Sequence, residues 1–250
     1  MYRGNWDKIT RSSDVAVVLG SGSSLNLYHS LAWSRIGMVD TFAMNNWVYH
    51  PFFVPTYYII ETKWYGFEIL KNRIYEKWLK YRGVQFLFQK DKVIKMKDGT
   101  RQPIREVVPE EAIYYDFEVV SRDPKRSSST KDAKYDYQEK TLTKSYDASL
   151  THLLEMIHRL GYKMIILCGM DMKDSHYFWT NPEWYYGEVH HRTNKEHEKK
   201  DPKKPHNTII VKDFVVSYAQ RLAEEDVSVL LGHSYSALNQ QIPVIDWRTL

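Results

Sequence analysis

The chain has 250 residues, of which 43% are hydrophobic and 26% are charged. This length and composition exclude a collagen-like, coiled-coil or fully disordered chain and predict one globular domain covering residues 1–250, with insertions. The net charge is only +4, and the basic residues gather in two polar stretches, which favours an anionic small ligand or a membrane surface over a nucleic-acid duplex.

The single cysteine, Cys168, lies inside an apolar run, so no intrachain disulfide can form and a reducing compartment is expected. We expect its thiol to be buried and unreactive. Residues 1–6 lack the apolar core of a secretory signal, and no later run reaches the roughly 20 apolar residues of a membrane span. These features predict a cytoplasmic protein that is at most peripheral at the inner face of the membrane.

The first half of the chain alternates short apolar runs with helical patterns. The expected strands cover residues 15–19, 41–44, 56–60 and 84–88, and the expected helices cover residues 25–36 and 63–80. Such β/α alternation predicts a parallel sheet. Residues 89–120 are ambiguous, with a candidate hairpin at Asp98-Gly99. Residues 121–145 have almost no apolar periodicity, and we expect a loop without regular structure there.

The alternation resumes in the second half. Residues 149–160 carry their apolar side chains on one helix face, and Gly161 ends that helix. A buried strand at 164–168 follows, and a helix with apolar positions between 210 and 222 leads to a last strand at 227–231. These elements continue the β/α alternation of the first half.

The predicted fold is α/β and Rossmann-like, with a mostly parallel sheet, helices on both faces and a lid insertion. The variable insertion covers about residues 89–145. The lid covers about residues 172–206, a polar and basic stretch that contains several aromatic residues.

A glycine-rich loop follows the first expected strand. In Gly20-Ser21-Gly22-Ser23-Ser24 the backbone amides can approach an anion at a helix N-terminus, where unpaired N–H groups favour negative charge. The loop lacks the Gly-Lys-Ser/Thr of a Walker loop and the third glycine of a dinucleotide fingerprint. This loop is compatible with two roles: contact with a nucleotide phosphate, or a plain turn in which a serine caps the helix N-terminus.

Polar residues also follow three other expected strands. Asn45-Asn46 can bind a ribose, base or sugar, although two turn asparagines would look the same. Glu61 and the segment Gly169-Met170-Asp171 occupy the matching places after the next strand and after the buried strand at 164–168. Because the carboxyl ends of parallel strands share one edge, these residues predict a ligand site there.

The histidines do not predict a metal site. No zinc-ligand spacing occurs among His176, His190, His191, His197, His206 and His233. A histidine acting as general base fits better, because a pKa of about 6.5 suits deprotonation of an alcohol near neutral pH. His206, between the basic lid and the following helix, is the best placed, and an exposed loop histidine is the alternative.

Three blocks occur in an order and spacing that resemble a known family. They are Gly20-Ser21-Gly22-Ser23-Ser24-Leu25, Asp40-Thr41-Phe42-Ala43-Met44-Asn45-Asn46, and the run from Ala148 to Asp171 with Leu160-Gly161-Tyr162-Lys163 inside it. The bacterial sialyltransferases of glycosyltransferase family forty-two carry Gly-Asn-Gly-Pro-Ser-Leu, Asp-x-Phe-x-x-Asn-Gln, and Thr-Ser-Gly followed by Leu-Gly-Tyr-Lys and Gly-Ile-Asp. The resemblance spans roughly residues 14–62 and 146–231.

This resemblance implies that the Rossmann-like fold is a GT-A-like variant. It also implies a transferase that uses a CMP-activated acidic sugar, such as sialic acid or the related octulosonic acid, and inverts the anomeric carbon. The implied acceptor is a saccharide or a lipid-linked glycan, and the CMP-sugar is a substrate, with no further cofactor and no metal. By position, the residues that would bind the CMP moiety are Gly22, Ser24, Asn45 and Ser149, and Asp171 would lie in the nucleotide site. The candidate donor site is completed by Gly20, Ser21, Asn46, Glu61 and Gly169.

The resemblance also implies the catalytic residues. Tyr177 corresponds to the second of two tyrosines that face the leaving phosphate, whereas the first position is occupied by Lys173. A lysine there can neutralise the developing phosphate charge. His206 corresponds to the family's catalytic histidine and would remove the proton of the acceptor hydroxyl.

Three residues depart from the family pattern. Ser21 and Glu61 replace asparagines, and Tyr146 replaces an arginine on the acceptor side, so the identities of donor and acceptor stay open. Glu61 in particular is unfavourable beside a carboxylated sugar.

Two other functions compete with this hypothesis. A pterin diphosphokinase-like enzyme would need ATP and magnesium, and the chain lacks a clustered set of carboxylates for it. A noncatalytic nucleotide- or glycan-binding module would use Trp179, Trp184, Tyr185 and Tyr186 as a stacking platform. We expect no nucleic-acid partner, and an oligomer is compatible with the sequence.

Overall fold

The computed structural model describes nine segments of the chain. They are residues 5–61, 66–89, 92–96, 98–108, 112–121, 141–145, 148–172, 177–178 and 208–250.

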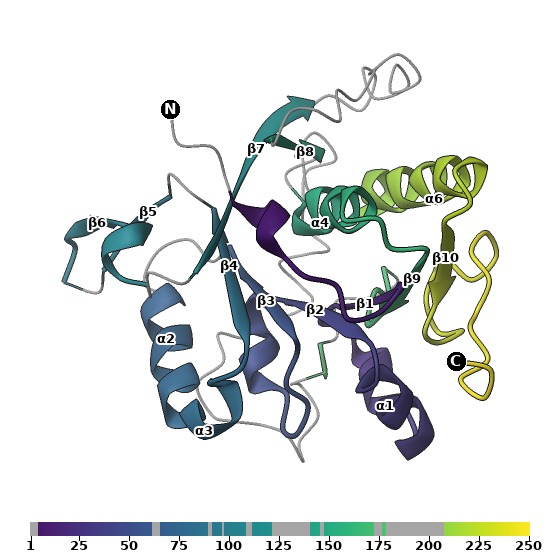
Figure 1. The fold of residues 1–250 in the computed structure, drawn as a ribbon, viewed down its shortest axis with the longest axis horizontal. Helices are drawn as coiled ribbons and strands as arrows, with labels where there is room; N and C mark the ends of the chain where they lie inside the picture. Colours follow the sequence, from purple (N-terminus) through teal and green to yellow (C-terminus); the bar gives the residue numbers. More distant parts are fainter. Residues whose placement is uncertain are drawn as a thin grey trace.

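The described residues form one parallel sheet, seen nearly edge-on in Figure 1. Its strands are β1 (Val15–Leu19), β2 (Asp40–Met44), β3 (Tyr57–Ile60), β4 (Gln85–Gln89), β7 (Ile113–Ser121), β8 (Thr141–Ser145), β9 (Met164–Cys168) and β10 (Ser228–Leu231). Their order is β10-β9-β1-β2-β3-β4-β7-β8, and every neighbouring pair is parallel. The predicted parallel sheet is therefore confirmed. The six strands expected from the apolar runs, β1 to β4, β9 and β10, begin and end within one residue of the expected positions, whereas β7 and β8 were not expected as strands.

The strand order reverses at β1. From β1 the chain extends the sheet in one direction through β2, β3 and β4, and later returns to add β9 and β10 on the other side of β1. In open parallel sheets this switch point is where the loops diverge and leave room for a ligand. The glycine-rich loop follows β1 directly, so the topology puts it at that position.

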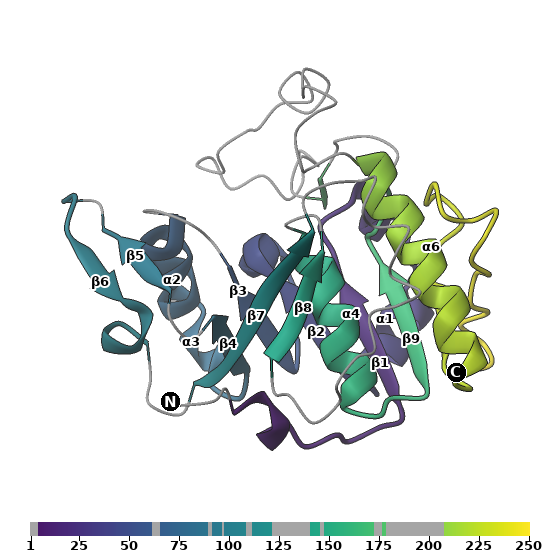
Figure 2. The same cartoon turned by 90° about the horizontal axis from the view of Figure 1, so that it is seen from above.

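Helices cover both faces of the sheet (Figures 1 and 2). One face carries α1 (Ser30–Ile36), α2 (Gly66–Glu76) and α3 (Trp78–Tyr81), and the other carries α4 (Ser149–Arg159) and α6 (Thr208–Glu224). Alternate strand residues feed the two cores: Val17 and Leu19 pack on the α1 side, whereas Ala16 and Val18 pack on the α4 side. A strand that is buried on both faces is a continuous apolar run in the sequence, which explains why such strands were easy to predict.

Two expected helices are each divided. The segment expected as one helix over 25–36 contains the 3₁₀ helix η2 (Ser23–Leu27) and then α1, because His29 caps α1 by accepting the Ala32 N–H at 3.2 Å. The described part of the segment expected over 63–80 breaks at Lys77 between α2 and α3. The Lys77 ammonium donates to the carbonyls of Val48 and His50, at 2.6 and 3.2 Å, in and after η3 (Asn45–Tyr49).

The hairpin expected at Asp98-Gly99 is confirmed. Strands β5 (Val93–Lys95) and β6 (Arg101–Pro103) pair antiparallel around it, and η4 (Ile104–Glu106) follows. Gly99 has a φ of 89°, a conformation that glycine adopts without strain, and Asp98 accepts the Thr100 N–H at 2.8 Å.

The expectation of a loop throughout residues 121–145 is wrong at both ends. Ser121 belongs to β7, and residues 141–145 form β8, which pairs with β7 in parallel at the edge of the sheet. The polar sequence Thr141-Leu142-Thr143-Lys144-Ser145 gives no apolar pattern. An edge strand is held by backbone hydrogen bonds to one neighbour, so it can form without such a pattern. Residues 122–140 lie outside the described residues.

Candidate functional site

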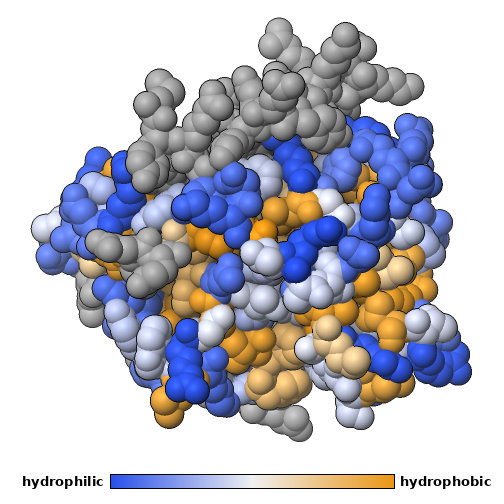
Figure 3. Space-filling model, viewed as in Figure 1, coloured by the Kyte–Doolittle hydropathy of each residue, from blue (hydrophilic) through white to orange (hydrophobic). Residues whose placement is uncertain are grey.

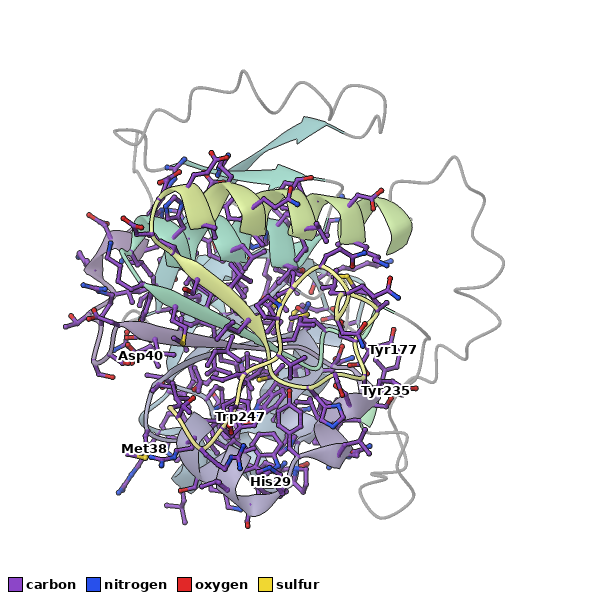
Figure 4. The ribbon with its side chains drawn as sticks, turned by 90° about the vertical axis from the view of Figure 1, so that its right-hand side faces the viewer. His29, Met38, Asp40, Tyr177, Tyr235 and Trp247 are labelled. Atoms are coloured by element: carbon purple, nitrogen blue, oxygen red, sulfur yellow. The ribbon has the colours of Figure 1, made fainter. Side chains whose placement is uncertain are left out.

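The polar strand ends lie together at the carboxyl edge of the sheet. Because β9, β1, β2 and β3 are consecutive neighbours, the residues that follow them occupy one edge, as the sequence predicted. Figure 4 shows the separation of the two edges: Asp40, which begins β2, lies on one side, and Tyr177, beyond the end of β9, lies on the other. The candidate site is built on this carboxyl edge.

The Asp171 carboxylate closes the glycine-rich loop. Its oxygens accept hydrogen bonds from the Ser24 N–H at 2.9 Å, from the Ser24 hydroxyl and from the Ser23 hydroxyl at 3.4 Å. Gly22 lies directly against it, since an added Cβ would be 2.5 Å from Asp171 Cγ. Asp171 is nearly fully buried, so the carboxylate is part of the loop's own structure.

Three of the five loop amides are engaged inside the protein. The N–H groups of Gly20 and Gly22 donate to the carbonyls of Cys168 and Gly169, both at 2.8 Å, and the Ser24 N–H binds Asp171. The expected long helix N-terminus is also replaced by the five-residue η2. A phosphate that used the Ser24 amide would have to displace Asp171, whereas a ligand resting on the outer side of the loop would not.

Gly169 and Tyr177 complete the surroundings of the loop. Gly169 has a φ of 65°, and a Cβ on it would lie 2.9 Å from the Leu25 side chain, so the close approach of β9 to η2 requires glycine. The backbone of Tyr177 bridges Gly22, and the N–H of the next residue donates to the Ser21 carbonyl at 3.0 Å. The structure therefore brings Tyr177 beside the predicted nucleotide loop.

A second polar cluster forms around Glu61. Its carboxylate accepts the Tyr115 hydroxyl at 2.9 Å and the Ser149 hydroxyl, and the His152 Nε2 lies 3.1 Å from Oε1. The Glu61 side chain is only 8% exposed and His152 is fully buried. We call Glu61, Tyr115, Ser149 and His152 the Glu61 cluster.

Burial controls the chemistry of this cluster. The pKa of Tyr115 is raised well above its usual value by burial and by the neighbouring Glu61 carboxylate, so the phenol keeps its proton and donates it. The His152 ring stacks on the Tyr115 ring, with centroids 5.2 Å apart. A carboxylate with this many donors is held firmly in one orientation.

Asn45 connects the two strand ends. Its side-chain Oδ1 accepts the Glu61 N–H at 2.8 Å, and its backbone carbonyl accepts the Tyr58 hydroxyl. The backbone φ of Asn45 is 48°, a left-handed conformation that asparagine tolerates better than most residues. Among the residues that the structure describes, no acceptor pairs with the Asn45 side-chain NH₂, which leaves that donor for a ligand. The next residue, Asn46, is half-buried in η3.

Tyr115 and His152 were missed in the sequence analysis. Tyr115 comes from β7, in the segment that had no clear pattern, and nothing local relates it to Glu61. His152 follows Ser149 by three residues, one turn of α4, so the helical spacing could have placed both side chains on one face. Two of the predicted catalytic residues, Lys173 and His206, lie outside the described residues.

Cys168 is fully buried, as expected, and burial raises its pKa to about 12. Over the described segments no group of three or more His, Cys, Asp or Glu side chains could hold a metal ion. In the same segments no helix is both long and apolar enough to cross a membrane.

Two solved structures have a similar fold. The monofunctional alpha-2,3-sialyltransferase Cst-I from Campylobacter jejuni superposes with a TM-score of 0.52 over 96% of this chain and 82% of its own, at 14% sequence identity. The sialyltransferase CstII from the same organism gives a TM-score of 0.44 over 92% and 86% of the two chains, at 11% identity. No family model and no curated protein matches the sequence. In its fold, this α/β chain therefore resembles the sialyltransferases of glycosyltransferase family forty-two, as its three sequence blocks predicted.

Proposed function

We propose that this protein is an inverting glycosyltransferase that transfers an acidic sugar of the sialic acid or octulosonic acid type from CMP to a saccharide or lipid-linked acceptor. One observation carries the proposal. The glycine-rich loop with Asp171 and the Glu61 cluster with Asn45 lie at neighbouring strand ends, at the switch point of a fold that resembles a sialyltransferase.

The donor site proposed for CMP uses the glycine-rich loop and the residues around Asn45, which lie on the same edge of the sheet. The nucleotide rests on the outer side of the loop and beside Asn45, whose side-chain NH₂ can donate to the base or ribose. The proposed set is Gly20, Ser21, Gly22, Ser24, Asn45, Asn46, Ser149, Gly169 and Asp171, with Glu61 beside the sugar. Asp171 then acts by holding the loop in shape rather than by contact with phosphate.

The proposed reaction needs one proton transfer. The acceptor hydroxyl oxygen forms a bond to the anomeric carbon while the bond from that carbon to the phosphate oxygen breaks, and CMP leaves. His206 takes the hydroxyl proton as general base, and Tyr177 and Lys173 stabilise the negative charge on the leaving phosphate. No metal or additional cofactor takes part in this proposal.

The Glu61 cluster restricts how an acidic sugar can bind. Two carboxylates about 6 Å apart repel by about 3 kcal/mol at an effective dielectric constant of about 20, which is roughly 100-fold in affinity. We therefore expect the carboxylate of the donor sugar to point away from Glu61, and a sugar hydroxyl to donate to Glu61 instead. This orientation reconciles Glu61 with a carboxylated donor.

Thermal unfolding with CMP, CDP, UDP, GDP and ATP, each with and without magnesium, tests the nucleotide class. A ligand at 100 times its Kd adds roughly 2.7 kcal/mol of stability. A metal-independent shift with CMP supports the proposal, whereas stabilisation only by ATP with magnesium favours the diphosphokinase alternative. The absence of any shift contradicts nucleotide binding at this edge.

Turnover of a CMP-sugar tests the reaction itself. We expect release of CMP from CMP-sialic acid by the wild type, and a loss of roughly 100-fold or more in His206→Ala. His190→Ala, a histidine of the same polar stretch, is the matched control and keeps the wild-type rate. CMP binding without turnover would instead support the noncatalytic module, and full activity of His206→Ala would remove the proposed base.

A further inference from the structure

Large apolar side chains lie on the surface where α2 meets α3. Tyr75 is 60% exposed, Trp78 47% and Leu79 82%, three within five residues. The rings of Tyr75 and Trp78 are near neighbours, with centroids 6.3 Å apart, and the Lys71 ammonium lies 5.8 Å from the Tyr75 ring centre. We call Lys71, Tyr75, Trp78, Leu79, Lys80 and Arg82 the α2–α3 patch.

The packing of these helices does not need the exposed side chains. Leu70, Ile74 and Tyr81 point inward and are buried in the core beneath the sheet. Lys77, at the break between the helices, binds two carbonyls in and after η3 and fixes the junction. The outer row is therefore held in place by the inner row, and its apolar surface faces solvent.

Positive charge is concentrated in the part of the sequence that contains this patch. Residues 66–108 contain 11 Lys and Arg against 5 Asp and Glu, whereas the rest of the chain contains 24 against 26. Glu76, the acidic residue nearest the patch in sequence, is paired with Arg73 at 2.8 Å. Both Figure 1 and Figure 2 show the β5–β6 hairpin beside α2, and its Val93 is 58% exposed. At the lower left of Figure 3, apolar and strongly hydrophilic residues lie next to each other over α2 and α3.

We infer that the α2–α3 patch docks the protein on an anionic phospholipid bilayer. Tryptophan and tyrosine favour the boundary between acyl chains and head groups, where the apolar part of the side chain contacts the acyl chains and its polar N–H or O–H contacts water. Leu79 would enter the acyl boundary, and Lys71, Lys80 and Arg82 would meet the phosphates. An acidic protein partner explains the charge but not a leucine left 82% exposed in the free protein.

Vesicle sedimentation of the full chain tests this inference and requires no nucleotide and no turnover. The vesicles contain phosphatidylglycerol and phosphatidylcholine in equal parts, or phosphatidylcholine alone. We expect binding only to the mixed vesicles. Each charge near an anionic surface changes partitioning roughly fivefold, so Lys80→Glu, which reverses one charge, should bind roughly thirty-fold more weakly. Leu79→Ser should bind roughly tenfold more weakly because it removes the inserted side chain.

Met38→Ser is the matched control. Met38 is 69% exposed in the turn after α1, and helix α1 lies apart from α3 in both ribbon views. Its substitution should leave binding unchanged. Thermal unfolding of all three variants should match the wild type, because each side chain is exposed. Failure to bind the mixed vesicles overturns the inference, and so does wild-type binding by Leu79→Ser and Lys80→Glu. Binding to heparin as strong as to vesicles, with no effect of Leu79→Ser, would indicate a simple polyanion site and also overturn it.

Discussion

Replacing Gly22 with alanine tests the contact that closes the glycine-rich loop. The new Cβ would lie 2.5 Å from the Cγ and 2.8 Å from the Oδ1 of Asp171, closer than carbon atoms pack in folded proteins. Asp171 cannot move without weakening its bonds to the Ser24 N–H and hydroxyl. A hydrogen bond to a charged group contributes roughly 1.5–3 kcal/mol. We therefore expect Gly22→Ala to lose about 2–3 kcal/mol of folding free energy.

Thermal unfolding is the assay for this prediction. In a chain of this size each kcal/mol corresponds to roughly 2–4 °C, so the midpoint should fall by roughly 4–12 °C. Gly83→Ala is the control, because a Cβ there meets nothing within 4 Å, and it should unfold like the wild type. If the proposed donor site is correct, Gly22→Ala also loses CMP affinity, whereas Gly83→Ala keeps it.

A double-mutant cycle tests whether Asp171 is the residue that clashes with the alanine at position 22. With Asp171→Ala the carboxylate is absent, so adding Gly22→Ala should cost much less than in the wild type, with a coupling free energy of about 1.5 kcal/mol or more. Additive losses would mean that the alanine clashes with something other than Asp171. An unfolding midpoint for Gly22→Ala equal to that of Gly83→Ala would refute the geometric argument altogether.

Three further predictions concern other buried groups. Glu61→Ala should destabilise the protein by about 3 kcal/mol, because it removes the carboxylate that accepts the hydroxyls of Tyr115 and Ser149. Glu61→Gln keeps an acceptor oxygen and should cost less than half of that in denaturant unfolding. Equal losses would contradict the hydrogen-bond argument. Burial lowers the pKa of His50 to about 3, so the unfolded chain takes up its proton first as the pH falls through 6.5, and stability should decline by about 2 kcal/mol by pH 5. Denaturant unfolding at pH 7.5 and pH 5 should show a smaller decline in His50→Asn, and an identical decline in both proteins would exclude His50 as its source. Gly232→Ala should lower the unfolding midpoint, since its Cβ would lie 2.6 Å from the Cys168 sulfur and overlap the Tyr28 hydroxyl. Adding Tyr28→Phe should recover part of the loss. If it recovers nothing, the clash is with Cys168 alone.

The sequence alone was sufficient for six of the eight strands of the sheet, β1 to β4, β9 and β10, and for the edge that carries the site. β1 and β9 are continuous apolar runs because both of their faces are covered by helices, and such runs are visible without knowledge of the partners. The turn at Gly99 was also visible, since an aspartate and glycine pair favours that conformation locally. Polar residues directly after these strands predicted the carboxyl edge, because parallel strands end on the same side.

Only the tertiary structure decided how the polar residues at that edge pair. Asp171 lies 147 residues after Ser24, and Tyr115 lies 54 residues after Glu61, so neither contact has a local sequence signal. The order of strands in the sheet creates both contacts. β9, which precedes Asp171, lies beside β1, which precedes Ser24. β7, which contains Tyr115, is separated only by β4 from β3, which precedes Glu61. β8 is likewise held by its hydrogen bonds to β7 rather than by an apolar pattern of its own. Local patterns thus determined the buried strands β1 to β4, β9 and β10, whereas the long-range strand order determined which side chains meet. A contact between distant residues exists only once the sheet has assembled.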